Sequence, residues 1–269
     1  MYNKLTEELA VCGFNAVKAL GELHPEKINR LFLRQDRLPL FAGVCKNLAE
    51  RKRPYKICED GELERICKTV HHQGIAAMIF ESPVKAAEEQ DLAAWAGEGK
   101  TGLLLCDVGN DLNLGAIVRS AAFFDASPVV IAGGGDTAGG RDENGPGGVR
   151  LSTGAYRAAE GGVEHVEFRS VRNPAAFLRS ASKILVSIGA DPRARLRIGD
   201  LPRLIRERAP PGRTGRPGVI LAAGNEETGL PQQVKDQCSL LARIPGTGAV
   251  ESLNVAQAVS LFLQVLYER

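Results

Sequence analysis

The C-terminal stretch, residues 218–269, constrains the fold most, because it contains two strand–turn–helix units in succession. The apolar run Val219–Ala223 leads into a polar, glycine-containing turn at 224–229 and then a helix. A second apolar run, residues 240–244, leads through the turn at 245–248 into a long closing helix. In a parallel α/β sheet such turns lie side by side at one edge, where small-molecule sites form. The stretch therefore predicts an α/β domain with a ligand site between these turns.

The start of the closing helix is polar and its body is apolar. Ser252 makes a good N-cap, and Asn254 in the first turn can point off the helix end toward the neighbouring turn. Free N–H groups at such an end suit a carboxylate or a developing oxyanion. An apolar stripe at helical spacing follows and predicts core packing. Its members are Leu253, Val255, Val259, Phe262, Leu263 and Leu266.

Several classes of function are excluded by what the sequence lacks. It has neither a phosphate-binding Gly-x-x-x-x-Gly-Lys-Ser/Thr run nor a Gly-x-Gly-x-x-Gly fingerprint that opens a helix after a strand, which argues against a nucleotide site of those types. Without a signal peptide or a bilayer-length apolar run, we expect a cytoplasmic protein with no membrane partner. Its 6 cysteines form no Cys-x-x-Cys pair and no His/Cys cluster. Neither a metal site nor a disulfide framework is therefore expected.

Positive charge is concentrated in two segments, although the net charge is only +2. Residues 30–56 contain eight basic residues and two acidic ones, and residues 193–216 contain eight arginines and two acidic residues. The rest of the chain is correspondingly acidic. Such segments suit a phosphate backbone. A run of charge is equally typical of a solvated surface, so composition alone leaves both interpretations open.

A strand followed by a helix is also predicted in the middle of the chain. Residues 103–108 are apolar enough for a buried strand of a parallel sheet. Asp111 or Asn113 then opens a helix, and Arg119 lies about a third of a turn around the helix from Asn113. Both side chains can border one pocket, although a salt-bridged surface arginine is the alternative for Arg119. The positions expected to face the sheet are Leu114, Ile117, Val118, Ala121 and Phe124.

Three motifs resemble those of the SpoU/TrmH ribose methyltransferases, which belong to the knotted SPOUT class. Asn-Leu-Gly-Ala-Ile-Val-Arg at 113–119 resembles the first motif, residues 221–230 the second, and residues 244–258 the third. Any one alone would be a weak signal, but three in order form a specific one. The resemblance implies a parallel-sheet α/β domain with a deep C-terminal trefoil knot. It also implies a homodimer that packs its knotted helices together.

The resemblance further implies S-adenosylmethionine as the cofactor and an RNA ribose 2′-hydroxyl as the methyl acceptor, with no metal. An arginine is a poor base at neutral pH, so we expect Arg119 to orient RNA phosphate and stabilise an alkoxide. Glu226 would orient Arg119 or an N–H of the cofactor pocket, while Ser252 and Asn254 fix the nucleotide or the third motif. The full catalytic set implied is Asn113, Arg119, Glu226, Ser252 and Asn254, and the cofactor contacts implied are Leu221, Gly224, Ile244 and Leu253.

Residues 1–80 are predicted to form a separate, small α/β domain, with strands at 28–33 and 55–58. Gly-Phe-Asn-Ala-Val at 13–17 and His-Gln-Gly-Ile-Ala at 72–76 resemble the ribosomal-protein-like domain with which bacterial SpoU enzymes hold RNA. His71 and His72 are expected on its RNA-facing or packing side, because no acidic or cysteine neighbour stands at metal-ligand spacing.

The other segments connect these parts. Residues 81–100 are predicted to be a linker with a short helix outside the core, and residues 101–269 the methyltransferase domain. Further strands are expected at 163–168 and 184–188. Residues 132–148 contain eight glycines and predict a mobile loop, and residues 202–217 predict an exposed arginine- and proline-rich insertion.

The motifs favour an RNA 2′-O-methyltransferase that acts on rRNA or tRNA. A catalytically silent RNA-binding or ribosome-assembly protein of the same fold is the alternative, against which the intact motif side chains argue. A base methyltransferase of the same class is a third interpretation, and Asn113 and Arg119 fit the ribose-directed subgroup better. Cofactor binding without methyl incorporation would distinguish the silent protein from the enzyme.

Overall fold

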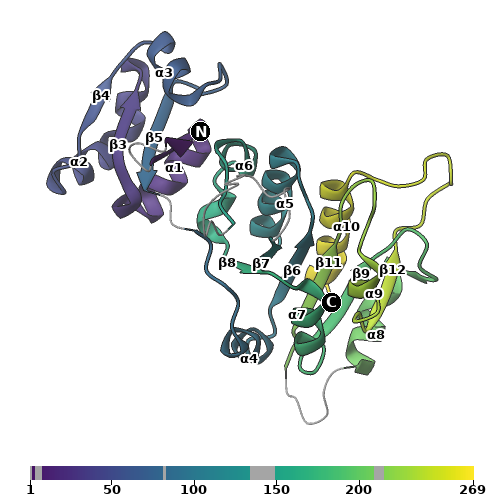
Figure 1. Ribbon diagram of the computed structural model, residues 1–269. Coiled ribbons are helices and arrows are strands. Elements are labelled where there is room, and N and C mark those ends of the chain that lie inside the picture. Colours follow the sequence, from purple (N-terminus) through teal and green to yellow (C-terminus); the bar gives the residue numbers. More distant parts are fainter. Residues whose placement is uncertain (1, 4–7, 81–82, 134–148, 209–214) are drawn as a thin grey trace.

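A computed structural model describes residues 2–3, 8–80, 83–133, 149–208 and 215–269 of the chain. Two α/β units follow one another along the chain, a smaller N-terminal one and a larger one (Figure 1). The smaller unit has a five-stranded sheet of order β1-β2-β5-β3-β4, and the larger one a seven-stranded sheet of order β10-β12-β9-β11-β6-β7-β8. In the described ranges no helix is both long and apolar enough to cross a bilayer.

The smaller unit alternates short strands and helices. Its elements are β1 (Tyr2–Asn3), β2 (Glu8–Cys12), α1 (Phe14–Leu23), η1 (Pro25–Lys27), β3 (Ile28–Leu33), η2 (Gln35–Phe41), α2 (Ala42–Glu50), β4 (Tyr55–Ile57), α3 (Asp60–Cys67) and β5 (Ile75–Phe80). β2, a fully buried strand that pairs with β5, is not among the strands predicted from the sequence. Its first residue, Glu8, is buried because Arg30 and Asn29 bind the carboxylate.

The larger unit is a doubly wound domain whose strand pairs are all parallel. Its elements are α4 (Glu89–Gly97), β6 (Thr101–Cys106), α5 (Asp111–Phe123), β7 (Ala126–Ala132), α6 (Thr153–Ala159), η3 (Gly162–His165), β8 (Phe168–Val171), α7 (Pro174–Ala181), β9 (Val186–Ala190), β10 (Leu196–Arg197), η4 (Ile198–Asp200), α8 (Leu201–Arg208), β11 (Val219–Ala223), α9 (Gln232–Lys235), β12 (Leu240–Arg243) and α10 (Val255–Tyr267).

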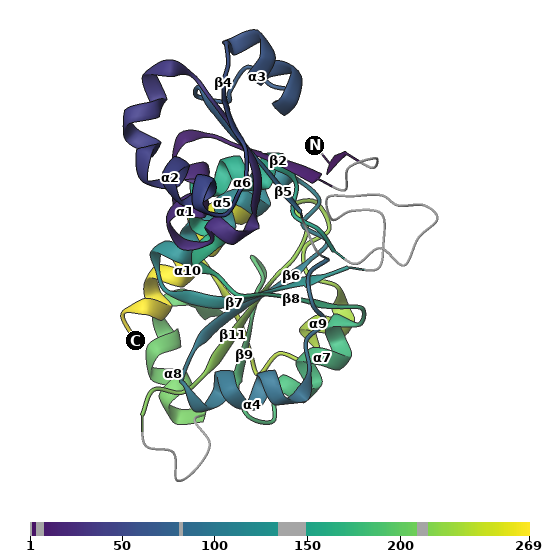
Figure 2. The ribbon, with the colours of Figure 1, turned by 90° about the vertical axis from the view of Figure 1, so that its left-hand side faces the viewer.

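Alternate residues of the central strands point to opposite faces of this sheet and form two cores. On one face Leu103 and Leu221 pack in the cluster that includes α5, α6, α8 and α10, and on the other Leu104 and Ile220 pack with α4, α7 and α9. Figure 2 shows the two layers of helices on either side of the strands. Because both faces are covered, the strands are apolar throughout, as the sequence predicts for β6 and β11.

Helix α4 lies in the segment expected to be a linker, and the expectation that it stays outside the core is wrong. Leu92, Trp95 and Ala96 are buried against the sheet. The indole Nε1 of Trp95 donates to Glu167, 3.1 Å away. Glu89 faces solvent and Asp91 pairs with Arg169, so the acidic residues of this segment lie off the apolar face that packs on the sheet.

Two further expectations are corrected. Residues 163–165 belong to the 3₁₀ helix η3, and β8 begins only at Phe168. The segment 202–217 is not simply an exposed insertion, because Leu204 and Ile205 of α8 are buried. These residues recur at helical spacing between arginines, so α8 is amphipathic. Residues 209–214 and most of the glycine-rich segment, 134–148, lie outside the described residues.

The two units meet where α6 and η3 contact the N-terminal unit. The Asn15 amide donates to Glu160 at 2.7 Å, Lys27 pairs with Glu164 at 2.8 Å, and Thr153 Oγ1 donates to the Ala10 carbonyl at 2.7 Å. Gly161 and Gly162 lie between helices of the two units. A Cβ on Gly161 would lie 2.9 Å from Ala19 of α1, and one on Gly162 would lie 3.2 Å from Arg119 Cα of α5. Close backbone approach therefore joins the units.

His72 belongs to the packing of the N-terminal unit. Its side chain is buried, and Nδ1 accepts a hydrogen bond from Gly74 N at 3.0 Å. The neighbouring Gln73 accepts from Phe14 N at 2.6 Å, so the two N-terminal motifs meet. His71 is exposed.

Candidate functional site

The candidate site lies at the carboxyl edge of the seven-stranded sheet, beyond β6 and β11 and beside the start of α10 (Figure 1). Since the strands are parallel, the turns that follow them collect at this edge, which is where ligands of open α/β sheets bind. The first, second and third motifs occupy these three positions.

One side chain from each motif forms a single hydrogen-bonded chain. The Asn113 amide, in the first turn of α5, donates to the carboxylate of Glu226. Asn113 Oδ1 in turn accepts from Asn254 Nδ2 at 3.1 Å. The structure therefore brings together three of the five side chains that the sequence analysis placed in the chemistry.

Asn254 also caps α10, and the expectation that Ser252 is the cap is wrong. Asn254 Oδ1 accepts from Ala256 N at 2.9 Å and from Gln257 N at 3.4 Å. The helix begins at Val255, so Ser252 is exposed and lies before the cap position. The side-chain oxygen of Asn254 thus accepts hydrogen bonds from the free N–H groups at the start of α10, while its side-chain nitrogen donates to Asn113.

The turn after β11 is held by Asn225, which the sequence analysis did not single out. Its side-chain oxygen accepts from Glu227 N at 2.9 Å and from Thr228 N at 3.2 Å, and its amide donates to the Asp107 carbonyl at 3.0 Å. This Asx turn joins the second motif to the end of β6. An Asn directly after Gly224, the first residue beyond β11, was the available signal.

Glycine is required at Gly224, because a Cβ there would lie 2.3 Å from the carbonyl of Gly229. The other glycines of the two turns face open space: a Cβ on Gly229, Gly246 or Gly248 would meet nothing within 4 Å. The turns therefore expose main chain with room beside it. Such an uncharged backbone surface suits an adenine or an amino-acid group better than a polyphosphate.

The other expected cofactor residues differ in position. Leu253 is 42% exposed and makes no hydrogen bond within the described part of the chain, so its N–H and C=O are available. Ile244 follows β12 and is half-buried. Leu221, by contrast, lies within β11, fully buried, opposite Leu103 and Ile188. It supports the sheet and does not reach the edge.

Arg119 is exposed on α5, and its side chain forms no ion pair or hydrogen bond with the described residues. It lies about 9 Å along the helix axis from Asn113. The next residue, Ser120, hydrogen-bonds Ser260 of α10 at 2.7 Å, so this part of α5 packs on the closing helix. Within one chain the structure does not join Arg119 or Ser252 to the Asn113 chain of hydrogen bonds.

Thiol and metal chemistry find no support at this edge. Cys106 ends β6, but burial raises the pKa of its thiol to about 12, which disfavours a thiolate nucleophile. Among the described residues no group of three or more His, Cys, Asp or Glu side chains could hold a metal ion.

Residues 100–264 match the family model of the SpoU rRNA methylases. The chain belongs to this family. Residues 10–85 match a second model, that of the substrate-binding domain of RNA 2′-O ribose methyltransferases. The resemblance seen in the three motifs and in the N-terminal segment is thereby confirmed.

Relatives of this SpoU protein match over nearly its whole length. It is 29% identical over 261 residues to the uncharacterized tRNA/rRNA methyltransferase YfiF of Escherichia coli O157:H7, which covers 96% of this chain and 67% of the relative. It is 29% identical over 263 residues to the 23S rRNA (guanosine-2′-O-)-methyltransferase RlmB of Nitrosomonas europaea, covering 96% of this chain and 91% of the relative.

Solved structures confirm the fold of this SpoU chain. An rRNA methyltransferase from Sinorhizobium meliloti superposes with a TM-score of 0.72 at 21% identity, over 98% of this chain and 88% of that one. The AdoMet-bound form of an rRNA methyltransferase from the same organism gives 0.69 at 22% identity, over 98% and 88%. The predicted α/β class with a parallel sheet is therefore correct.

Proposed function

We propose that this SpoU protein transfers a methyl group from S-adenosylmethionine to a ribose 2′-hydroxyl of rRNA or tRNA. The observation that carries the proposal is the hydrogen-bonded chain Asn254–Asn113–Glu226, which links one residue of each family motif at the ligand edge of the sheet. The relatives named as 2′-O-methyltransferases support the same assignment.

The cofactor is held by main chain in this proposal. S-adenosylmethionine supplies an electrophilic methyl group on a sulfonium and needs no metal. Gly224, Ile244 and Leu253 offer backbone groups at adjacent turns, and the open space beside Gly246 and Gly248 admits the ligand. Holding the methyl group in line with the attacking oxygen supplies much of the rate.

Arg119 acts on the RNA. Its guanidinium stays charged at neutral pH, so it orients a phosphate and stabilises the developing alkoxide, while water or phosphate takes the proton. Glu226 orients Asn113, to which it is hydrogen-bonded, in addition to the two targets expected from the sequence, Arg119 or an N–H of the cofactor pocket. Ser252, exposed beside Leu253, contacts the nucleotide.

A homodimer completes the site. Leu112 and Phe123 of α5 are 52% and 79% exposed, and Leu261 and Tyr267 of α10 are 44% and 55% exposed. Leu112, Arg119 and Phe123 lie at positions i, i+7 and i+11, hence on one side of α5. An exposed apolar face of this kind favours burial against a second copy. Arg119 then lies at the interface, within reach of the partner subunit's site.

The remaining assignments rest on family membership. Residues 1–80 hold the RNA substrate, residues 101–269 carry the chemistry, and the C-terminal segment is threaded as a trefoil knot. The protein works in the cytoplasm, where ribosomal and transfer RNA are made and modified in bacteria.

Methyl transfer tests the proposal directly. Purified protein is incubated with methyl-labelled S-adenosylmethionine and RNA from cells that lack it, and the labelled nucleotide is mapped. We expect label on a ribose 2′-oxygen of rRNA or tRNA. Label on a base would favour a base methyltransferase. Cofactor and RNA binding without any incorporation would favour a silent RNA-binding or ribosome-assembly protein.

A further inference from the structure

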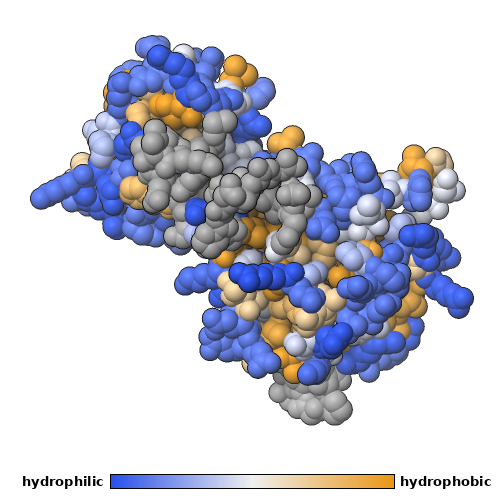
Figure 3. Space-filling view, viewed as in Figure 1, coloured by the Kyte–Doolittle hydropathy of each residue, from blue (hydrophilic) through white to orange (hydrophobic). Residues whose placement is uncertain are grey.

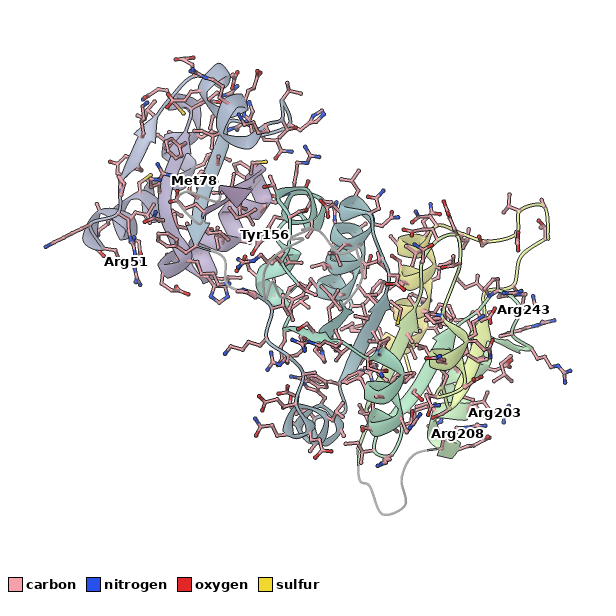
Figure 4. The ribbon with its side chains drawn as sticks, in the orientation of Figure 1. Arg51, Met78, Tyr156, Arg203, Arg208 and Arg243 are labelled. Carbon is pink, nitrogen blue, oxygen red and sulfur yellow. The ribbon has the colours of Figure 1, made fainter. Side chains whose placement is uncertain are left out.

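Four arginines gather at the end of the seven-stranded sheet that lies away from the N-terminal unit. Arg193, Arg195 and Arg197 occupy alternate positions leading into β10, and Arg243 ends the neighbouring strand β12. The first three are exposed and Arg243 is half-exposed. Figure 4 labels Arg243 on this side, and Figure 3 shows hydrophilic side chains there. We call these four residues the arginine edge.

The strand register places two of these positive charges directly opposite each other. β10 and β12 pair in parallel with Arg197 opposite Arg243. Like charges at opposed positions of neighbouring strands destabilise a sheet. Among the described residues neither of these side chains, nor that of Arg195, forms an ion pair, so no described carboxylate offsets the repulsion.

The nearest carboxylate does not neutralise the cluster. Asp191 lies 4.0 Å from Nε of Arg193, but its other oxygen is bound at 2.7 Å by Lys235, which is largely buried. The second acidic residue near the cluster, Asp200, accepts a hydrogen bond from Arg197 N through Oδ2 at 3.1 Å. The positive charge of the edge therefore remains available to an external anion.

The arginine edge also lies beside the candidate site. Arg197 and Arg243 stand at the carboxyl ends of parallel strands, as do the turns that carry Glu226 and lead to Asn113. Arg243 immediately precedes Ile244 and the third motif. Arg193 lies in the turn after Asp191, which the hydrogen bond from Ala194 N to the Asp191 carbonyl closes at 3.1 Å. Arg195 lies in the bend before β10, and Arg197 and Arg243 end the two paired strands, so the edge presents several cations and not a single point. Several neighbouring cations suit a polyanion.

We propose that the arginine edge binds the phosphate backbone of the RNA substrate, as a second contact on the opposite side of the site from the N-terminal unit. The inference rests on the proposed function for the nature of the substrate. RNA then spans the molecule, held by the N-terminal unit at one end and by the arginine edge at the other, with the modified ribose between them.

The test compares two variants of the full-length protein that lose the same charge. The edge variant carries Arg195→Gln, Arg197→Gln and Arg243→Gln, and the control carries Arg203→Gln, Arg206→Gln and Arg208→Gln on α8. Binding of deproteinised ribosomal RNA and of a short RNA duplex is measured over a range of salt concentrations without cofactor. We expect the edge variant to bind about 10- to 100-fold more weakly and its salt slope to fall by about 2.

Equal weakening in both variants, or unchanged binding in the edge variant, would overturn the proposal. Unchanged RNA binding with lost binding to vesicles of anionic phospholipid would also overturn it, since the surface would then be a membrane contact. Circular dichroism and calorimetric S-adenosylmethionine affinity, both expected to match wild type, check that the edge variant is folded. RNA binding is measured here without methyl transfer. The result of this test can therefore be interpreted even if the protein proves to have no methyltransferase activity.

Discussion

Asn254 donates a hydrogen bond to Asn113 over 3.1 Å, although the two residues are 141 positions apart in the chain. The same Asn254 oxygen caps the closing helix, so the start of α10 and the start of α5 are fixed to each other by one amide. Asn113 in turn donates a hydrogen bond to Glu226. The geometry of the candidate site thus depends on two neutral amides and one carboxylate.

Replacing Asn113 by Ala removes both hydrogen bonds and leaves the Glu226 carboxylate without its donor. A lost hydrogen bond to a charged group costs about 1.5 to 3 kcal/mol, so we expect methyl transfer to fall about tenfold or more. The initial rate of incorporation into RNA provides the measurement. Asn173→Ala, which removes the cap of the distant helix α7, is the matched control. It should lower stability by about 1 kcal/mol and leave transfer unchanged.

Gly162→Ala tests the backbone contact between η3 and α5. The new Cβ would lie 3.2 Å from both Arg119 Cα and the Val118 carbonyl oxygen, and 3.3 Å from Ala122 Cβ. Overpacking of this kind lowers the free energy of unfolding by about 1 to 3 kcal/mol, which urea unfolding measures. Gly43→Ala in α2, where a Cβ would meet nothing within 4 Å, should instead raise stability. Equal effects of the two substitutions would contradict the packing described.

The ion pair between Asp91 and Arg169 predicts a pH dependence of stability. The Arg169 guanidinium, bonded at 3.0 Å, holds the pKa of the Asp91 carboxyl below its ordinary value of 3.8. The pair therefore stabilises the fold above that value and loses its effect as the pH falls through the lowered pKa. Asp91→Asn should cost about 1 kcal/mol at pH 7 and almost nothing under acid conditions. Urea unfolding of Asp91→Asn and wild type at pH 7 and under acid conditions measures the difference in the free energy of unfolding. A destabilisation that persists in acid would exclude the ionic explanation.

The thiols should be unreactive in the native protein. All 6 cysteines are free and five are buried. Burial raises the pKa of Cys106 and of Cys238 to about 12, and it also raises the pKa of Cys45 and Cys58. The hydrogen bond with Cys67 lowers the pKa of Cys12, but the Cys12 side chain is fully buried and therefore shielded from reagents. A disulfide-exchange reagent at pH 8 should titrate less than one thiol per chain before denaturation and all of them afterwards. Rapid native reaction of several thiols would show that the cores are open.

Local signals predicted the strands well wherever turns bounded an apolar run. β3 and β11 have the expected limits, Ile28–Leu33 and Val219–Ala223. The missed strand β2 begins with a buried glutamate whose partner, Arg30, lies 22 positions away. Such a strand cannot be recognised from its own residues, because a distant side chain makes its burial possible.

Long-range contacts also explain the other differences. Gly161 and Gly162 let η3 approach two helices at once, so a stretch rich in valine forms no strand there. At the site, the three motifs implied that Asn113, Glu226 and Asn254 are neighbours, but the sequence could not show that Asn254 and not Ser252 caps α10. That choice follows from where the closing helix starts, which is set by its packing against α5.

In the proposed mechanism Arg119 acts on the RNA, while the turns around Gly224 and Leu253 hold the cofactor. The substitution Arg119→Ala, assayed for both cofactor affinity and methyl transfer, tests this separation of roles most directly. Arg119 has no partner among the described residues, so its loss should leave the fold and the turns around Gly224 and Leu253 intact. We expect S-adenosylmethionine to bind as in wild type by calorimetry, while transfer to RNA falls about 100-fold or more, as for the removal of one charge-stabilising group. Wild-type methylation by Arg119→Ala would contradict the account, because the sugar oxygen would then be activated without this arginine.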